Sequence, residues 1–87
     1  MSDVPEATFL NFIGGLAAQG LMQLGEIPNP VDGERVVHPE HARYTLEVLR
    51  ILREKTEGRL DENEEAYLSA AIADIEARYA AQGEGEA

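Results

Sequence analysis

Residues 7–25 contain no charged side chain, and this uncharged stretch constrains the fold of the chain more than any other feature. Large apolar residues recur within it at helical spacing on one face: Phe9, Phe12, Ile13, Leu16 and Leu24. The glycines at positions 14, 15 and 20 each cost up to about 1 kcal/mol inside a helix relative to alanine. We therefore predict a first helix over about residues 6–25 that depends on packing against its surroundings.

Two further sets of residues describe the sides of this predicted helix. Leu10, Ala17 and Leu21 widen the apolar face to about half of the circumference, at about 100° per residue. Gly14, Ala18 and Gly25 line an edge of small residues. We expect a neighbouring backbone to come close along that edge.

The segment that follows has the composition of a structured loop. Gly25 suits a left-handed position after the helix, and Pro28 and Pro30 hold the chain extended. Asp32-Gly33, between two valines, favours a small hairpin turn. A loop of this length either straps the core or binds a partner. The residues of the possible binding loop are Glu26, Ile27, Pro28, Asn29 and Pro30.

A second helix is predicted over about residues 39–57, with His38 as its N-cap and Pro39 at its first position. Its apolar residues sweep an arc of about 220° on a helical wheel: Ala42, Tyr44, Leu46, Val48, Leu49, Ile51 and Leu52. That arc is wider than one packing partner needs. Gly58 is the expected C-cap residue.

A third helix is predicted over about residues 62–82, beginning with a capping-box pattern of Asp61 and Glu64. Its apolar stripe consists of Tyr67, Leu68, Ala71, Ile72, Ile75 and Tyr79. The short connection makes the second and third helices an antiparallel hairpin. The prediction is a single all-α domain of three helices over residues 1–82, with 83–87 as a disordered acidic tail.

The charge balance opposes binding to nucleic acid. The chain has 17 acidic and 7 basic residues, a net charge of −10, whereas binding to phosphates needs clustered positive charge. Six of the seven basic residues lie within 35–59, but acids interleave with them. The N-terminal Met-Ser-Asp-Val-Pro-Glu is acidic where a signal peptide is basic, so we expect a cytoplasmic location.

Several motifs between Thr8 and Tyr79 match a known family. They are Phe9 and Phe12, Ala18-Gln19 with Leu21, the block Gln23-Leu24-Gly25-Glu26-Ile27-Pro28-Asn29-Pro30, Ala42-Arg43, and Glu54-Lys55-Thr56-Glu57-Gly58 before Glu64-Glu65. The chain thereby resembles a small bacterial family, the domain of unknown function numbered eighteen forty-four. Arg59-Leu60-Asp61 stands where members usually have Asn-Leu-Thr, and Leu46-Glu47 where they have Ile-Asp. The resemblance implies a short helical bacterial protein and supplies no catalytic residues.

Candidate chemical groups are few. His38 and His41 are three residues apart and could share a metal, but no third ligand is indicated, so we interpret them as an N-cap and a solvent-facing neighbour. The acids Glu40, Glu47, Glu64 and Glu65 fit a solvated face better than acid–base catalysis. The absence of cysteine excludes thiol catalysis, and the only serines, Ser2 and Ser69, lie in no nucleophile motif. We therefore expect neither a catalytic site nor a cofactor.

Self-association is the function class that the sequence favours. A chain of 87 residues buries only about 60% of its unfolded surface, and its apolar arcs exceed what three short helices cover. We predict a homo-oligomer, most simply a dimer, that acts as an interaction or adaptor protein and could also bind another protein. The predicted interface residues are Phe9, Phe12, Ile13, Gly14, Leu16, Ala18, Tyr44, Val48 and Ile51.

Two alternatives stay open at this stage. The uncharged first helix could place the chain at a membrane surface, although its glycines, asparagine and glutamines make a poor membrane span and no Lys or Arg lies on its polar face. The chain could also be a regulator that binds a small ligand or a metal.

Overall fold

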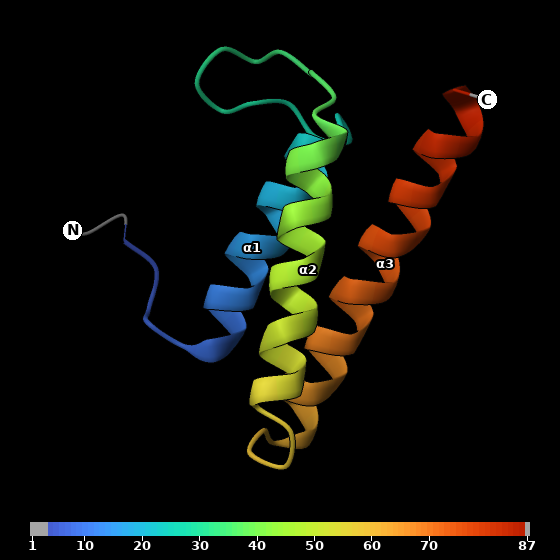
Figure 1. The fold of residues 1–87 in the computed structure, drawn as a ribbon. Coiled ribbons are helices and arrows are strands. Elements are labelled where there is room, and N and C mark those ends of the chain that lie inside the picture. Colours follow the sequence, from blue (N-terminus) through green and yellow to red (C-terminus); the bar gives the residue numbers. More distant parts are fainter. Residues whose placement is uncertain (1–3, 87) are drawn as a thin grey trace.

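Residues 4–86, the part of the chain that the computed structural model describes, fold into three helices. They are α1 (Phe9–Gln23), α2 (Pro39–Lys55) and α3 (Glu62–Glu86). In Figure 1, α1 and α3 run in the same direction and α2 lies antiparallel to both. Each helix contacts the other two. The predicted all-α, three-helix class and the antiparallel hairpin of the last two helices are therefore confirmed.

Side-chain and backbone caps set the ends of α1. The Thr8 hydroxyl accepts a hydrogen bond from Asn11 N at 3.0 Å, so the helix begins at Phe9 rather than near residue 6. At the other end Gly25 N donates to Met22 O at 3.0 Å and Glu26 N donates to Leu21 O at 2.9 Å. This is a Schellman motif. Gly25 has a φ of 73°, as the predicted left-handed position requires.

Backbone hydrogen bonds close the loop between α1 and α2 at its base and again near its tip. His38 N donates to Gln23 O at 2.6 Å. Farther out, Asn29 N donates to Glu34 O at 2.8 Å and Gly33 N donates to Asn29 O at 2.7 Å. Gly33 has a φ of 72°. A turn is therefore present here, but it runs from Asn29 to Gly33 and is not centred on Asp32-Gly33 as predicted.

The ends of α2 follow the prediction closely. His38 is the N-cap residue and Pro39 occupies the first turn, although the His38 side chain makes no capping hydrogen bond. The helix ends at Lys55 rather than near 57, and Thr56 is the C-cap residue in place of Gly58. Gly58 instead has a φ of 77° in the turn that Arg59 N closes on Thr56 O at 2.9 Å.

The capping box predicted at the start of α3 is formed in both directions. Glu64 N donates to Asp61 Oδ1 at 2.7 Å, and Asp61 N donates to Glu64 Oε1 at 3.0 Å. At the other end the helix continues to Glu86, whereas the sequence analysis ended it near Gln82 and predicted a disordered tail. Extending an existing helix adds one hydrogen bond per residue fixed, which offsets the poor propensity of the last glycines. Ala87 lies outside the described residues.

The core is a single cluster to which all three helices contribute. Its buried residues are Ile13, Leu24, Ala42, Leu46, Leu49, Leu68, Ala71, Ile72 and Ile75. Gly20 packs closely against both other helices, since a Cβ there would be 3.0 Å from Ile75 Cδ1 and 3.3 Å from Thr45 Cγ2. On the predicted small-residue edge, a Cβ at Gly14 would be 3.0 Å from the Tyr67 hydroxyl oxygen and one at Gly25 would be 3.0 Å from Val37 Cγ2, with the backbone of Val36 at 3.9 Å. Close approaches therefore occur at these two residues as well as at Gly20, which was not predicted.

Candidate functional site

Helix α2 has two apolar sectors, and the domain covers only one of them. Leu49 is fully buried and Leu46 nearly so. On the other side Tyr44 is 70% exposed and Ile51 is 55% exposed. Val48, between them along the helix, is half-buried. The wide apolar arc predicted for this helix is real, and about half of it faces outward.

Helix α1 adds an exposed aromatic residue beside the outer sector of α2. Phe12 is 54% exposed and lies three helical turns before Gln23, so the two residues share a side of α1. Gln23 Oε1 accepts a hydrogen bond from Thr45 Oγ1 of α2 at 2.7 Å, so that side is the one toward α2.

The antiparallel run of the two helices gives the position of Phe12 along α2. Gly20 packs beside Thr45, so Phe12, eight residues earlier in α1, lies level with the Ile51 end of the outer sector. We call Phe12, Tyr44, Val48 and Ile51 the α1–α2 face.

The structure separates the predicted interface residues into distinct groups. Phe12, Tyr44, Val48 and Ile51 come together on the α1–α2 face, as described above. Ile13 is fully buried in the chain's own core, so it cannot serve as an interface residue in this fold, and Phe9 and Leu16 are half-buried against that core. Helical spacing alone placed these three with Phe12, because it does not show how far the neighbouring helices reach around α1.

The two small residues of the predicted interface lie elsewhere on α1. Gly14 faces α3, where a Cβ would be 3.0 Å from the Tyr67 hydroxyl oxygen. Ala18 is exposed. Neither residue belongs to the α1–α2 face. Tyr67 was predicted to belong to the apolar stripe of the third helix, but it is 44% exposed and is not part of the buried core.

The first residues of the possible binding loop are tied to α3. Glu26 Oε2 is 3.2 Å from Arg78 Nη1. Arg78 Nε also donates to Asp74 Oδ1 at 2.9 Å. Asp74, through this hydrogen bond and its charge, raises the pKa of the Arg78 guanidinium, and Glu26 adds to the rise. Gln82 Nε2 of α3 donates to Leu24 O at 2.9 Å, so α3 also holds the end of α1 just before the loop.

The rest of that loop is partly free. Ile27 and Asn29 are half-buried, while Pro28 and Pro30 are exposed. The side chain of Asn29 accepts from Val31 N at 2.8 Å, so it holds the loop's own turn. The contacts of Glu26 and Asn29 agree with a strap across the end of the bundle, and the exposed prolines are what the loop offers to a partner.

The two candidate metal ligands lie beside a pocket of about 370 Å³ under this loop. The rings of His38 and His41 have centroids 5.7 Å apart and meet edge to face. Asn29, Asp32 and Glu34 also line the pocket. Within residues 4–86, however, no group of three or more His, Cys, Asp or Glu side chains is placed to hold a metal ion.

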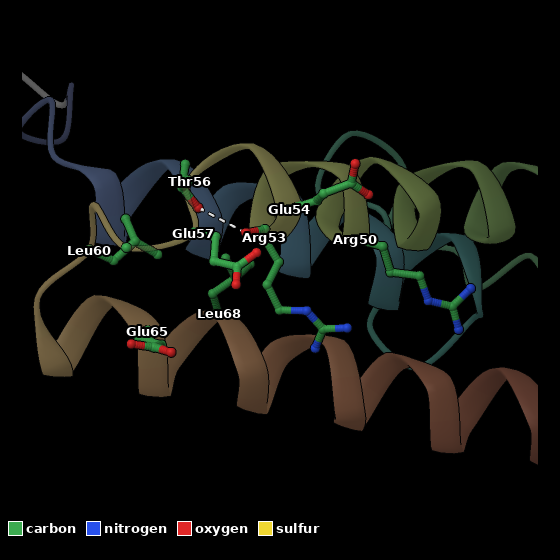
Figure 2. Close-up of a pocket in the computed structure, with 9 residues that line it drawn as sticks. Arg50, Arg53, Glu54, Thr56, Glu57, Leu60, Glu65 and Leu68 are labelled. Carbon is green, nitrogen blue, oxygen red and sulfur yellow. Dashed lines mark hydrogen bonds between the residues drawn. The ribbon is translucent and has the colours of Figure 1, made fainter.

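A second pocket, of about 490 Å³, lies between the last turns of α2 and the first turns of α3. Leu60 and Leu68 supply apolar lining, and Arg53, Glu57 and Glu65 bring charges of both signs (Figure 2). Arg50, also on its rim, forms an ion pair with Glu76. This pocket could not be predicted from the sequence, because the charged residues that line it are typical of the surface of an amphipathic helical hairpin.

Over residues 4–86, none of the helices combines the length and the hydropathy that crossing a membrane demands.

Comparison with known proteins identifies the family. The model of a domain of unknown function, DUF1844, matches residues 6–81. The match covers nearly the whole chain, so the chain belongs to this family, as its motifs indicated. No curated protein and no solved structure matches the chain significantly.

Proposed function

We propose that this member of the DUF1844 family is a small helical interaction protein that associates with itself, most simply as a dimer, through the α1–α2 face. The observation that supports the proposal is the exposure of Phe12, Tyr44 and Ile51, at 54%, 70% and 55%, on adjoining sides of two packed helices. The role requires no catalytic group and no cofactor.

The energetics of burial favour covering this face. Removing a large apolar side chain from water is worth about 1.5–3 kcal/mol. Soluble monomers rarely leave such residues contiguous unless the patch binds something. Phe12 and Tyr44 are also aromatic, and aromatic side chains are enriched at the centres of protein interfaces.

The charge pattern is compatible with association at this face. Helix α1 has no charged residue between Phe9 and Gln23, so nothing on its side of the face repels a second copy. The net charge of −10 opposes association at long range, but charges farther apart than about 8 Å are largely screened at physiological salt.

An adaptor role adds a second protein to this assembly. The surface that we assign to it is the exposed part of the loop around Pro28 and Pro30, because the α1–α2 face is used between copies. Proline-containing segments pay little conformational entropy when they bind, which suits a contact loop. The cytoplasm is the compartment that we propose for this role.

Light scattering coupled to size-exclusion chromatography tests the proposal. The wild-type chain at micromolar concentration is expected to have twice the monomer mass of 9.5 kDa. Ile51→Asp is expected to shift the mass to that of the monomer while leaving the helical circular dichroism unchanged, because Ile51 contributes little to the core.

Val31→Asp is the matched control, since Val31 is 91% exposed and lies in the loop, away from the α1–α2 face. It introduces the same charge at an exposed apolar position and is expected to leave the dimer intact. A wild-type mass equal to that of the monomer across the micromolar range contradicts the proposal.

A further inference from the structure

One side of α3 carries a row of polar side chains that reaches the end of α1 and the start of the loop. Asp74, Arg78 and Gln82 are four residues apart, so they lie on successive turns along one side of the helix. Gln82 Nε2 donates to the carbonyl oxygen of Leu24 at 2.9 Å, and Arg78 Nη1 is 3.2 Å from Glu26 Oε2. We call Asp74, Arg78 and Gln82 the polar row of α3.

The hydrogen bond from Gln82 serves a carbonyl group at the end of α1. Leu24 is the C-cap residue of that helix, and the last carbonyl groups of a helix have no donor within it. Leu24 is only 1% exposed, so this bond lies beside the core. The end of α1 is therefore fixed by a residue 58 positions away, on a different helix.

Arg78 is oriented toward the loop by its own helix. Its Nε donates to Asp74 Oδ1 at 2.9 Å, while its Nη1 reaches Glu26. A guanidinium that one carboxylate already holds loses less side-chain entropy when it meets a second carboxylate. The Arg78 and Glu26 side chains are 43% and 34% exposed, so salt screens the attraction between them.

The segment that follows Glu26 is stiff enough to carry this constraint outward. Glu26 N donates to Leu21 O at 2.9 Å, so both the backbone and the side chain of Glu26 are held. A proline fixes its own φ and restricts the residue before it. Pro28 and Pro30 therefore limit four consecutive residues, 27–30. The direction in which the two exposed prolines point is set at Glu26.

We propose that the polar row of α3 is a clasp that fixes the start of the α1–α2 loop, thereby aims Pro28 and Pro30, and is loosened by salt. This inference rests on the contact role proposed for the loop and adds how the loop is held ready. A loop that is already ordered pays less entropy when a partner binds. Arg78 and Gln82 are positioning residues for that contact, because they act through Glu26 and Leu24.

Amide hydrogen exchange, measured residue by residue by NMR on the whole chain, tests the clasp. The reporters are the amides of Gly25 and His38, which donate to carbonyl groups of α1 where the loop meets that helix. Arg78→Gln is expected to speed their exchange about 2- to 5-fold, as the loss of an exposed ion pair allows. Gln82→Ala is expected to speed it about 2- to 10-fold, because it removes a hydrogen bond beside the core.

NMR relaxation measures the aim of the prolines in the same samples. The backbone amides of Asn29 and Val31 lie next to the two prolines, and their order parameters are expected to fall in Arg78→Gln. Faster exchange at the reporters with unchanged order parameters at Asn29 and Val31 would show that the clasp does not aim the prolines. That result overturns the proposal.

Arg50→Gln is the matched control. It changes the net charge equally and removes the ion pair with Glu76, whose side chains are 45% and 44% exposed. It is expected to leave the reporter amides at the wild-type rate. The amide of Ile72, in the core, provides the reference for global unfolding. Equal acceleration of the reporters and of Ile72 in Arg78→Gln overturns the proposal, because the effect is then global.

Salt gives an independent measurement that needs no substitution in the clasp. Raising sodium chloride from about 0.01 M to about 1 M shortens the screening length from about 30 Å to about 3 Å. It is expected to bring the reporter exchange of the wild-type chain to the rate of Arg78→Gln and to change that variant little. An equal effect of salt on the two proteins overturns the ionic clasp.

The outcomes separate this inference from the proposed function. The polar row lies on α3, outside the α1–α2 face, so Arg78→Gln is expected to leave the mass in light scattering unchanged. Unchanged exchange in Arg78→Gln and Gln82→Ala overturns the clasp and leaves self-association standing. A monomeric wild-type chain overturns self-association, whereas faster exchange in the two variants still supports the clasp.

Discussion

Two residues on one helix, two positions apart, show the main contrast in this molecule. Leu49 is fully buried between α1 and α3, whereas Ile51 is 55% exposed. Both are aliphatic, and both belong to the same broad apolar arc of α2. The comparison teaches that residue type predicts which segments are helical, and that the placement of the other two helices decides which apolar sector becomes core.

The first prediction tests this contrast by truncating both residues. Leu49→Ala is expected to lower the free energy of unfolding by about 3 kcal/mol, because it leaves a cavity among buried side chains. Ile51→Ala is expected to lower it by less than about 0.5 kcal/mol in the monomer, since solvent already reaches that side chain and alanine is the better helix former. Urea denaturation followed by circular dichroism measures both.

Protein concentration separates folding from association in that experiment. Dilution below the dimer dissociation constant gives the monomer's stability, because a dimer adds concentration-dependent stability. The core assignment of α2 is wrong if the two truncations cost the same amount under dilute conditions.

The second prediction concerns the close packing of the helices at Gly20. Gly20→Val is expected to cost about 1–3 kcal/mol, as overpacking usually does, because its Cβ would be 3.0 Å from Ile75 Cδ1 and 3.3 Å from Thr45 Cγ2. Gly15 on the same helix, where a Cβ would have no neighbour within 4 Å, supplies the control Gly15→Val, which makes the same change in helix propensity without the close contacts. Thermal unfolding that shifts equally in the two variants would contradict close packing at Gly20.

Much of the backbone could be predicted from the sequence because local chemistry determines it. The capping box of Asp61 and Glu64, the first-turn position of Pro39 and the left-handed Gly25 each depend on residues within one or two turns. Such local interactions leave a recognisable pattern in the sequence. Thr8 is the same kind of local signal at the start of α1. It was missed because the uncharged stretch begins at Ala7, before the cap, and the predicted helix was started near residue 6.

The candidate site was less predictable because it depends on the packing of distant segments. Periodicity grouped Ile13 with Phe12, although the structure buries the first and leaves the second 54% exposed. The hydrogen bond between Thr45 and Gln23 joins residues 22 positions apart, so no local sequence pattern predicts it. Likewise, Glu26 gave no sequence indication that it would pair with Arg78 instead of facing a partner.

The third prediction measures that distant hydrogen bond. Thr45 is only 2% exposed, so Thr45→Val keeps its shape and removes the hydroxyl that donates to Gln23 Oε1. The expected loss is about 1 kcal/mol of unfolding free energy, typical of a side-chain hydrogen bond. A double-mutant cycle with Gln23→Leu isolates the pair. A coupling energy of zero would show that the bond does not hold α1 against α2.

The last prediction has the smallest expected effect and returns to the open side of α1. A Cβ at Gly15 would have no neighbouring atom within 4 Å, so Gly15→Ala meets no obstacle in the monomer. It is expected to raise the unfolding free energy by about 0.5–1 kcal/mol, because alanine is the better helix former and restricts the unfolded chain. Thermal unfolding at low protein concentration measures this gain. The mass in light scattering then shows whether a second copy approaches the same position: a stabilised chain that dimerises normally places Gly15 outside the interface, and one that dimerises more weakly extends the interface from Phe12 across α1.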